Sequence, residues 1–461
     1  MQKTLVILVV GLAPDLVGRH TPNLAKLAKD GALRPLDTVT PAVTCSAQAT
    51  LVTGLQPSGH GIVANGWYFR DLCEILLWRQ PNNLVAGEKI WDAGKARDPN
   101  FTSAKMFWWY NMYATADFSA TPRPKYPADG RKLPDHYAEP PELHDELDAK
   151  LGTFPLFKFW GPLADITSSD WIAKSTLHVM ETRDPTLTLS YLPHLDYNLQ
   201  RLGPDLDHPR LQEDLREVDA LCGELIDYAR ATDRRIVVVS EYGITPATDA
   251  VHINRALREA GLLRVRPEEF GREILDAGAS RAFAMADHQI AHVYVQDPDL
   301  IPKVRGIIEG LDGVESVWGA EDKARNGLDH PRSGELVAVA KADRWFSYYY
   351  WLDDSVAPDF ARTVDIHRKP GYDPVELFFD PELRSPKMKA AWTLAKRKAG
   401  QRSLLDVISP NATHLVKGTH GRITDDPAAG PLVISSESGL MPEGSVAATD
   451  FKQLVLDHVF R

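Results

Sequence analysis

VTPAVTCSAQATLVTGLQPSGHGIVANGWY, residues 39–68, is the stretch of sequence that indicates the fold most clearly. Thr44 stands where a helix is expected to begin, and Gly54 is its expected end because glycine readily adopts the left-handed conformation found there. A hydroxyl at the amino end of a helix lies in a partial positive charge that stabilises a developing alkoxide or an incoming phosphate. Because threonine is also a common N-cap residue, Thr44 alone does not identify a function.

The chain on both sides of this stretch predicts strands that alternate with helices. Residues 4–12 form a continuous apolar run rich in β-branched residues, which is typical of a central strand buried on both faces. Residues 21–31 carry the start and stop signals of a helix. Strands are also predicted at 186–196 and 235–243, with an amphipathic helix between them at 211–225. We therefore predict an α/β fold with a doubly wound, mainly parallel central sheet and helices on both faces.

The region from about residue 65 to 185 differs in composition from the rest of the chain, because aromatic residues and prolines are frequent in it. We interpret it as an inserted cap region over the sheet. A further irregular segment is expected at about 342–410, and its acidic part is interpreted as a solvated face. A single domain with these two segments is predicted over residues 1–461. Further short strands are predicted at 289–295, 335–340 and 430–436.

Charge and composition disfavour several classes of protein. A formal net charge of −11 disfavours a nucleic-acid binder, which would usually show a basic face. The apolar run at the amino terminus is short and lacks a cleavage site of small residues, so no secretory signal is expected, and no run approaches a membrane span. The three cysteines have no paired spacing and fit a reducing cytoplasm. The sequence does not indicate an oligomeric state.

Polar residues follow the predicted strands at the ends where doubly wound sheets place their sites. In YLPHLDYNLQR, His194 and Asp196 lie two residues apart on what we expect to be extended chain, so their side chains would share one side. Glu241 and Tyr242 follow the apolar run of the next strand, and His420 lies in the turn KGTHGR. Each has a structural alternative: a hydrogen-bonded loop, a helix cap or an ordinary glycine turn.

Together these clusters resemble the nucleotide pyrophosphatase/phosphodiesterase branch of the alkaline phosphatase superfamily, and TPNL with residues 39–65 is the strongest match. The resemblance implies an alkaline-phosphatase-like fold in which Thr44 is the nucleophile that attacks phosphorus. It also implies two zinc ions held by six side chains. Asp196 and His420 match ligands of the family, and Glu241 is a longer carboxylate where the family has aspartate.

Three of the six ligand positions depart from the family pattern. Val10 replaces an aspartate, and Gln200 and Tyr242 each replace a histidine; in addition, Ala47 replaces an asparagine that helps to hold phosphate oxygens. Valine cannot bind a metal, a neutral amide is a poor zinc ligand, and tyrosine binds only with a much lowered pKa. Two tightly held zinc ions are therefore not expected. One divalent ion, most readily zinc, is predicted at Asp196, Glu241 and His420, with His194, Tyr242 and His288 as further candidates.

A threonine without an adjacent metal needs another group to activate it. The sequence offers these substitutes: Asp287, His288, His292, His330, Asp353, Asp354 and His367. For substrate binding, Asn65 and Tyr68 follow the turn on the substrate side of the family, and the aromatic insert offers stacking surfaces, although aromatic residues more often build a core. The cations predicted to bind phosphate are Arg70, Lys417 and Arg422, and exposed salt bridges would explain them as well.

Two hypotheses follow. The first is a hydrolase of a small-molecule phosphoric ester or anhydride, with Thr44 as nucleophile and an altered, mononuclear metal site. A phosphonate or sulfate ester hydrolase of the same superfamily would differ only in its substrate. The second is a pseudoenzyme that binds an anionic or aryl ligand without turnover. The intact threonine stretch favours the first, and the three lost ligands favour the second.

Overall fold

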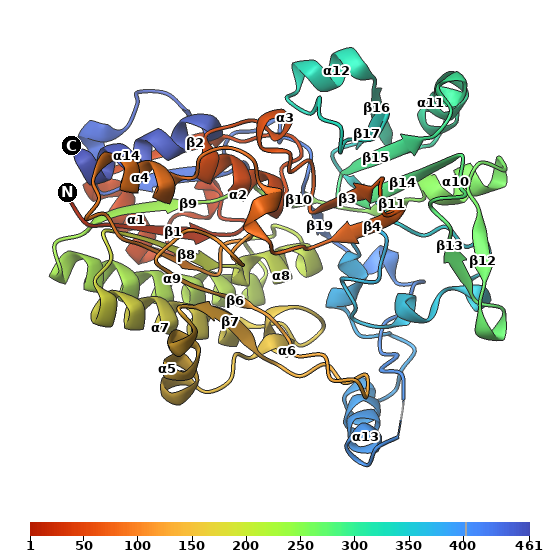
Figure 1. Ribbon diagram of the computed structural model, residues 1–461, viewed down its shortest axis with the longest axis horizontal. Helices are drawn as coiled ribbons and strands as arrows, with labels where there is room; N and C mark the ends of the chain where they lie inside the picture. Colours follow the sequence, from red (N-terminus) through yellow and green to blue (C-terminus); the bar gives the residue numbers. More distant parts are fainter. Residues whose placement is uncertain (402) are drawn as a thin grey trace.

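The computed structural model describes residues 1–401 and 403–461. Its central feature is a nine-stranded sheet with helices on both faces (Figure 1). β1 pairs in parallel with β8 and β9, and β5 and β6 continue the parallel part beyond β8. The predicted doubly wound, mainly parallel sheet is therefore confirmed. In sheet order the strands are β21 (Val446–Ala447), β2 (Ala32–Asp37), β20 (Leu432–Ser435), β9 (Arg235–Val239), β1 (Thr4–Val9), β8 (Leu187–Leu192), β5 (Ser103–Met106), β6 (Phe118–Pro122) and β7 (His136–Glu139).

β1 lies in the middle of the sheet, as its continuous apolar sequence predicts. Every side chain from Leu5 to Val10 is fully buried, because neighbouring strands flank β1 and helices cover both faces of the sheet. The strands β1, β8 and β9 run in the same direction, so their carboxyl ends meet at one edge. Val10, Pro193 and Ser240 are the residues that follow shortly after these ends.

One face of the sheet is covered by α9, which packs against α1, α7 and α8, and the other face carries α2, α4 and α14 (Figure 1). The predicted apolar stripe of α9 is confirmed, since its leucines and Cys222 are buried. No described helix is long and apolar enough to cross a membrane. These helices are α1 (Pro22–Asp30), α2 (Thr44–Thr53), α4 (Ile90–Arg97), α7 (Ile166–Arg183), α8 (His194–Leu202), α9 (Pro209–Ala231) and α14 (Phe451–Phe460).

A second, smaller sheet of four antiparallel strands lies beside the central sheet, on the right in Figure 1. Its order is β14 (Ala282–Asp287), β15 (Ile290–Val295), β17 (Leu336–Ala340) and β16 (Val314–Trp318). Around it lie α10 (Ile253–Glu259), α11 (Ile301–Glu309) and the hairpin of β3 (Gly66–Phe69) and β4 (Glu74–Leu77). The remaining short strands are β10 (Thr245–Pro246), β11 (Asp249–Val251), β12 (Val265–Pro267), β13 (Glu273–Leu275), β18 (Arg344–Phe346) and β19 (Gly418–Thr419).

The two segments predicted as insertions contribute to more than one part of the fold. Within 65–185, β5, β6 and β7 extend the central sheet, and the β3–β4 hairpin packs against the second sheet. Within 342–410, Asp353 is exposed, but Asp373 is buried, so the acidic part is not one solvated face. The domain boundaries themselves stay a prediction. The remaining helices are α3 (Pro57–His60), α5 (Pro141–Leu151), α6 (Leu156–Phe159), α12 (Ala320–Arg325) and α13 (Pro386–Lys398).

Candidate active site

Thr44 lies at the edge where the parallel strands end. It is the first residue of α2, its N-cap neighbour is Val43, and the helix ends at Gly54 with a left-handed φ of 74°. The Thr44 hydroxyl is therefore free of a capping role and faces the chain that follows β9. Its Oγ1 lies 3.3 Å from Oη of Tyr242, within hydrogen-bond distance, and the residue is only 5% exposed.

Asp196 lies on the far side of Tyr242 and is fully hydrogen-bonded by protein groups. The Tyr242 hydroxyl donates to Oδ1 of Asp196 at 3.3 Å, and Nε2 of Gln200 donates to Oδ2 at 2.9 Å. Asp196 and Gln200 can meet because they are four residues apart on α8 and share one face of the helix. Burial raises the pKa of Asp196 to about 6, although the hydrogen bonds from Gln200 and Tyr242 act to lower it.

Four stacked rings lie over this carboxylate. Tyr242 stacks on His420 with centroids 3.6 Å apart, His420 lies 3.6 Å from His288, and His288 lies 3.6 Å from Tyr372. Nδ1 of His420 donates to the carbonyl of Ala42 at 2.8 Å, while Nε2 lies 4.0 Å from Oδ1 of Asp196. Burial lowers the pKa of His420 to about 3, so this imidazole is neutral at pH 7.

Glu241 lies beneath the site and is fully buried. Its Oε1 accepts a hydrogen bond from Gln48 at 3.0 Å, and Oε2 has no partner among the described residues. Burial and the nearby charge of Asp196 raise the pKa of Glu241 well above its ordinary value, against the lowering effect of the Gln48 amide. A protonated carboxyl is a poor metal ligand because ligation requires the ionised form.

Replacing Glu241 by glutamine should increase stability at alkaline pH. Because the folded-state pKa of Glu241 lies above its ordinary value of 4.5, the stability that the neutral form contributes is complete below about pH 4.5. It is lost as the pH rises through the folded-state pKa. Glutamine stays neutral, so we expect equal stability near pH 4 and a gain of more than about 1 kcal/mol at pH 8, measured by urea unfolding. An equal difference at both pH values would contradict a neutral Glu241.

Asn65 connects the start of α2 to the turn between β14 and β15. Its backbone N–H and side-chain amide donate to the two carboxylate oxygens of Asp287 at 2.7 and 3.0 Å, and its Oδ1 accepts from the backbone N–H of Cys45 at 3.0 Å. Burial raises the pKa of Asp287 to about 7. His288, the next residue, belongs to the ring stack, so this turn closes the site from the second sheet.

Residues 4–373 match the family model of the type I phosphodiesterases and nucleotide pyrophosphatases. The chain belongs to this family. An uncharacterised pyrophosphatase/phosphodiesterase of Schizosaccharomyces pombe is 28% identical over 263 residues, which cover 54% of this chain and 46% of that protein. Ectonucleotide pyrophosphatase/phosphodiesterase 1 of Saccharomyces cerevisiae is 27% identical over 272 residues, covering 52% and 34%. The chain thus matches less than half the length of these two curated relatives.

Two solved structures share the phosphodiesterase fold. Murine ectonucleotide pyrophosphatase/phosphodiesterase 5, an inactive threonine-to-alanine variant in complex with AMP, gives a TM-score of 0.58 at 16% identity and covers 100% of this chain and 95% of its own. Phosphonoacetate hydrolase from Sinorhizobium meliloti, in complex with phosphonoformate, gives 0.61 at 14% identity, covering 99% and 96%. At these identities the likeness shows the fold alone.

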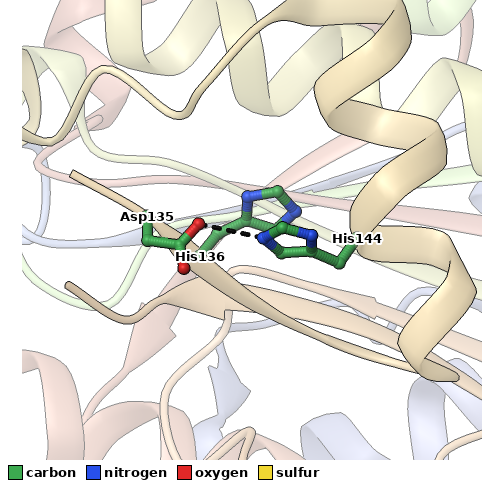
Figure 2. A group of neighbouring side chains, drawn as sticks. All are labelled: Asp135, His136 and His144. Atoms are coloured by element: carbon green, nitrogen blue, oxygen red, sulfur yellow. Dashed lines mark hydrogen bonds and ion pairs between the residues drawn. The ribbon is translucent and has the colours of Figure 1, made fainter. Parts of the chain in front are cut away.

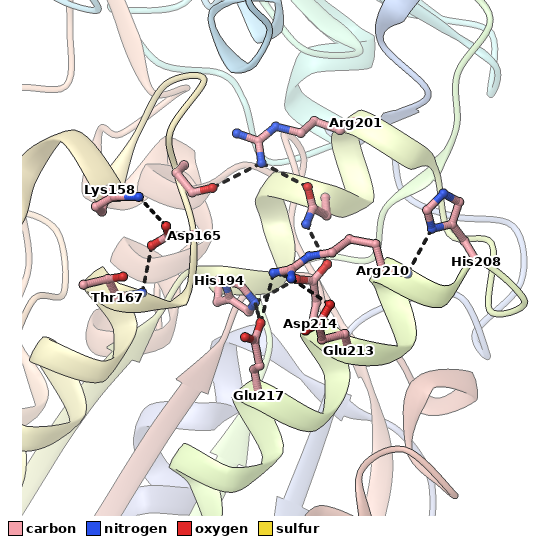
Figure 3. Close-up of polar contacts among 12 residues, drawn as sticks. Lys158, Asp165, Thr167, His194, Arg201, His208, Arg210, Glu213, Asp214 and Glu217 are labelled. Atoms are coloured by element: carbon pink, nitrogen blue, oxygen red, sulfur yellow. Dashed lines mark hydrogen bonds and ion pairs between the residues drawn. The ribbon is translucent and has the colours of Figure 1, made fainter. Parts of the chain in front are cut away.

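The two-zinc arrangement that the family resemblance implies does not fit the side chains of this member of the family. Two groups of three metal-binding side chains occur in the described part of the chain, Asp135 with His136 and His144 (Figure 2) and His194 with Asp214 and Glu217 (Figure 3). Neither group includes the predicted ligands Asp196, Glu241 and His420. Each oxygen of Asp196 already accepts a hydrogen bond from a protein donor, and burial disfavours the ionised form of Glu241.

His194 lies away from this site, contrary to our prediction. The strand ends at Leu192 and α8 begins at His194, so two residues correspond to about 200° around a helix rather than to one side of a strand. Nε2 of His194 lies 3.1 Å from Asp214 and 3.3 Å from Glu217 (Figure 3). His194 therefore contributes to the packing of α8 on α9.

The predicted substrate-binding side chains engage protein partners. Tyr68 packs on Phe283 and Tyr294 in the second sheet. The three cations are paired: Arg70 with Glu335 at 2.8 Å, Lys417 with the carbonyl of His414 at 2.9 Å, and Arg422 with Glu315 at 2.6 Å and Asp425 at 3.0 Å. A role in phosphate binding stays a prediction for all of them, and for Asn65.

Sequence reasoning missed Tyr372 and Gln48. Tyr372 donates to Oε1 of Gln200 at 2.9 Å and ends the ring stack, and Gln48 bridges Glu241 to the backbone N–H of Trp109. Gln48 could have been found, because it lies one turn after Thr44 on the same helix. Tyr372 comes from an irregular segment whose sequence gives no periodic signal.

Proposed function

We propose that this phosphodiesterase hydrolyses a small-molecule phosphoric ester or anhydride, with Thr44 as the nucleophile and Asp196 as the base that acts through Tyr242. One observation carries the proposal: Oγ1 of Thr44, Oη of Tyr242 and Oδ1 of Asp196 form a continuous chain of contacts, each 3.3 Å long. In this chain Tyr242 stands between the nucleophile and a carboxylate, where the family resemblance places a metal ligand.

The proposed proton path follows from the direction of these hydrogen bonds. Because Tyr242 donates its proton to Asp196, its oxygen accepts the proton of Thr44. As the Thr44 oxygen bonds to phosphorus, its proton passes to Tyr242 and the Tyr242 proton passes to Asp196, while the bond from phosphorus to the leaving oxygen breaks. The amino terminus of α2 stabilises the negative phosphoryl oxygens, and water then hydrolyses the phosphothreonine. Thr44 is buried, so substrate entry requires the ring stack to shift.

A divalent ion takes no part in the proposed reaction. Members of the family typically depend on divalent metal, and one zinc ion held by Asp196 and His420 stays a prediction. The two side chains lie 4.0 Å apart, but no third carboxylate or imidazole of the described chain completes a group with them. A cytoplasmic location likewise stays a prediction.

Turnover should depend on pH through Asp196 and should require the Tyr242 hydroxyl. Asp196 accepts a proton only when ionised, so kcat/KM for bis-p-nitrophenyl phosphate should fall as the pH drops below about 6. Tyr242→Phe keeps the ring that stacks on His420 and removes only the hydroxyl. We expect it to lower kcat by roughly 10²-fold or more and to abolish the acid limb of the profile.

Tyr350→Phe is the matched control for this experiment. It removes a buried hydroxyl that donates to the carbonyl of Glu273 in β13, outside the contacts of Thr44, so its pH profile should equal that of the wild type. If Tyr242→Phe keeps the wild-type rate and profile, the proposed relay is wrong. Circular dichroism of all three proteins confirms that each is folded.

A binding protein without turnover is the second candidate, favoured by the closed state of the site. Thr44 is buried, Asp196 is fully hydrogen-bonded, and Ala47 stands where the family resemblance implies a phosphate-holding asparagine. The test is calorimetric titration of the wild type with AMP, the ligand of the murine neighbour, together with an assay for released phosphate. Saturable binding with no product from AMP or from bis-p-nitrophenyl phosphate at any pH would favour this second function.

A further inference from the structure

A cluster of metal-binding side chains lies between an edge strand and a helix, away from Thr44. Asp135 directly precedes β7, and His136 is the first residue of that strand. His144 and Asp148 lie four residues apart on α5, so they share the face of the helix that packs on β7. Figure 2 shows the carboxylate of Asp135 beside the two imidazole rings.

The contacts of His144 and Asp135 orient their ligand atoms toward each other. Nε2 of His144 lies 2.9 Å from Oδ1 of Asp135, and Nδ1 of His144 lies 2.9 Å from Oδ1 of Asp145. Lys125 holds the other oxygen of Asp135, Oδ2, at 2.7 Å. Metal-binding histidines typically donate their second ring N–H to a carboxylate in this way, which directs the remaining nitrogen at the ion.

His136 supplies the second, independent observation. The residue is 2% exposed, and neither of its ring nitrogens has a hydrogen-bond partner among the residues that the structure describes. Oδ1 of Asp148 is likewise buried without such a partner and lies 3.7 Å from Nδ1 of His136. Buried polar atoms are rarely left unpaired because desolvation without compensation is costly. Burial also lowers the pKa of His136 to about 4, which leaves a neutral imidazole with a free lone pair.

We propose that Asp135, His136, His144 and Asp148 form a structural zinc site that fastens β7, the last strand of the sheet, to α5. Imidazole nitrogens and carboxylate oxygens both bind zinc, and Asp135, His136 and His144 offer three such atoms within 4.8 Å of one another, to which Asp148 would add a fourth by a shift of its side chain. The two imidazole rings lie face to face, with centroids 4.4 Å and planes 19° apart, so one ring turns when the ion binds. The site requires neither Thr44 nor Asp196.

The other group of three side chains, around His194, also holds buried ring nitrogens without a hydrogen-bond partner among the described residues, but its carboxylates already contact a cation. The guanidinium of Arg210 lies 2.6 Å from Oδ1 of Asp214 and 3.0 Å from Oε2 of Glu217 (Figure 3). The guanidinium therefore contacts both carboxylates of that group, whereas Lys125 contacts only Oδ2 of Asp135 and leaves Oδ1 beside His144. Zinc would have to displace a permanently charged side chain, so this group serves as an internal negative control.

The test counts zinc in protein that has been stripped with a chelator, reloaded with zinc and passed through a desalting column. We expect His144→Ala and Asp135→Asn each to retain one zinc per chain fewer than the wild type. Asp196→Asn, His194→Gln and the exposed-histidine control His414→Ala should retain the zinc that His144→Ala loses. Zinc should also raise the thermal unfolding midpoint of the wild type and leave that of His144→Ala unchanged.

The outcomes separate this proposal from the catalytic one. If both His144→Ala and Asp135→Asn lose one zinc ion per chain while their circular dichroism equals that of the wild type, the zinc site is supported. This conclusion does not depend on the result of the esterase assays. If both variants keep the wild-type zinc content, or if the wild type retains none, the site does not exist. If Asp196→Asn loses the same equivalent, the ion belongs to the Thr44 site and the proposal is overturned.

Discussion

Thr44→Ala should lower kcat for bis-p-nitrophenyl phosphate by about 10⁶-fold, which is the scale of loss when an enzyme loses its covalent nucleophile. The expected loss is this large because Tyr242 and Asp196 act only by removing the proton of Thr44. Neither Gln48 nor Glu241 can replace the lost oxygen, since they bond to each other beneath the site. Initial rates of p-nitrophenol release near pH 8, where Asp196 is ionised, provide the measurement.

Two matched variants make the Thr44→Ala result interpretable. Thr44→Ser retains a hydroxyl and should keep most of the rate, within roughly 10- to 100-fold of the wild type. Thr53→Ala removes the last threonine of the same helix, whose hydroxyl donates to the carbonyl of Ala49, and should not change kcat. If the wild type turns over the substrate and Thr44→Ala retains its full rate, Thr44 is not the nucleophile.

The fold was predictable where burial alone determines secondary structure. Residues 4–12 are apolar without alternation, and only a strand buried on both faces needs such a sequence, so β1 could be placed at the centre of the sheet. The strands β5, β6 and β7 within 65–185 were not predicted, because the prolines and aromatic residues of this segment suggested a cap. β5 and β6 are only four and five residues long, which is too short to give a periodic signal.

The candidate site was less predictable, because its contacts join distant parts of the chain. Asp196 and Tyr242 could be named from their positions after strands and His420 from its glycine turn, and the structure brings these three together with Thr44. The role of Tyr242 could not be predicted. Its hydrogen bond to Thr44 depends on the distance between the two side chains, which only the folded chain determines. Similarly, Tyr372 meets Gln200 from 172 residues away.

The segment that carries Tyr372 is held by a buried ion cluster. Lys369 is 1% exposed, and its Nζ lies 2.8 Å from Oδ2 of Asp373 and 2.7 Å from Oε1 of Glu376. The indole N–H of Trp160 donates to the other oxygen of Glu376 at 2.6 Å. Lys369 precedes Tyr372 in sequence and Asp373 and Glu376 follow it, so the cluster fixes the residue that closes the ring stack over Asp196.

Lys369→Met should lower the free energy of unfolding by about 3–5 kcal/mol at pH 8, because it leaves two buried carboxylates without a counter-charge. Protonation relieves this cost. Burial already raises the pKa of Glu376 and Lys369 acts to lower it, so without the lysine this folded-state pKa rises further, and a group with a raised folded-state pKa loses its stabilising contribution as the pH increases. The loss should therefore be smaller at pH 5 than at pH 8, and urea unfolding at the two pH values measures both.

Lys174→Met is the matched control, because Lys174 pairs with Asp170 at 2.7 Å on the exposed side of α7. We expect this substitution to lower the free energy of unfolding by only about 0.3–0.5 kcal/mol. The triple variant Lys369→Met, Asp373→Asn, Glu376→Gln removes all three charges and should recover part of the loss, because no buried charge remains unpaired. Turnover should fall in Lys369→Met and return in part in the triple variant if the cluster positions Tyr372. A Lys369→Met protein as stable as Lys174→Met at pH 8 would show that the three charges are not buried together.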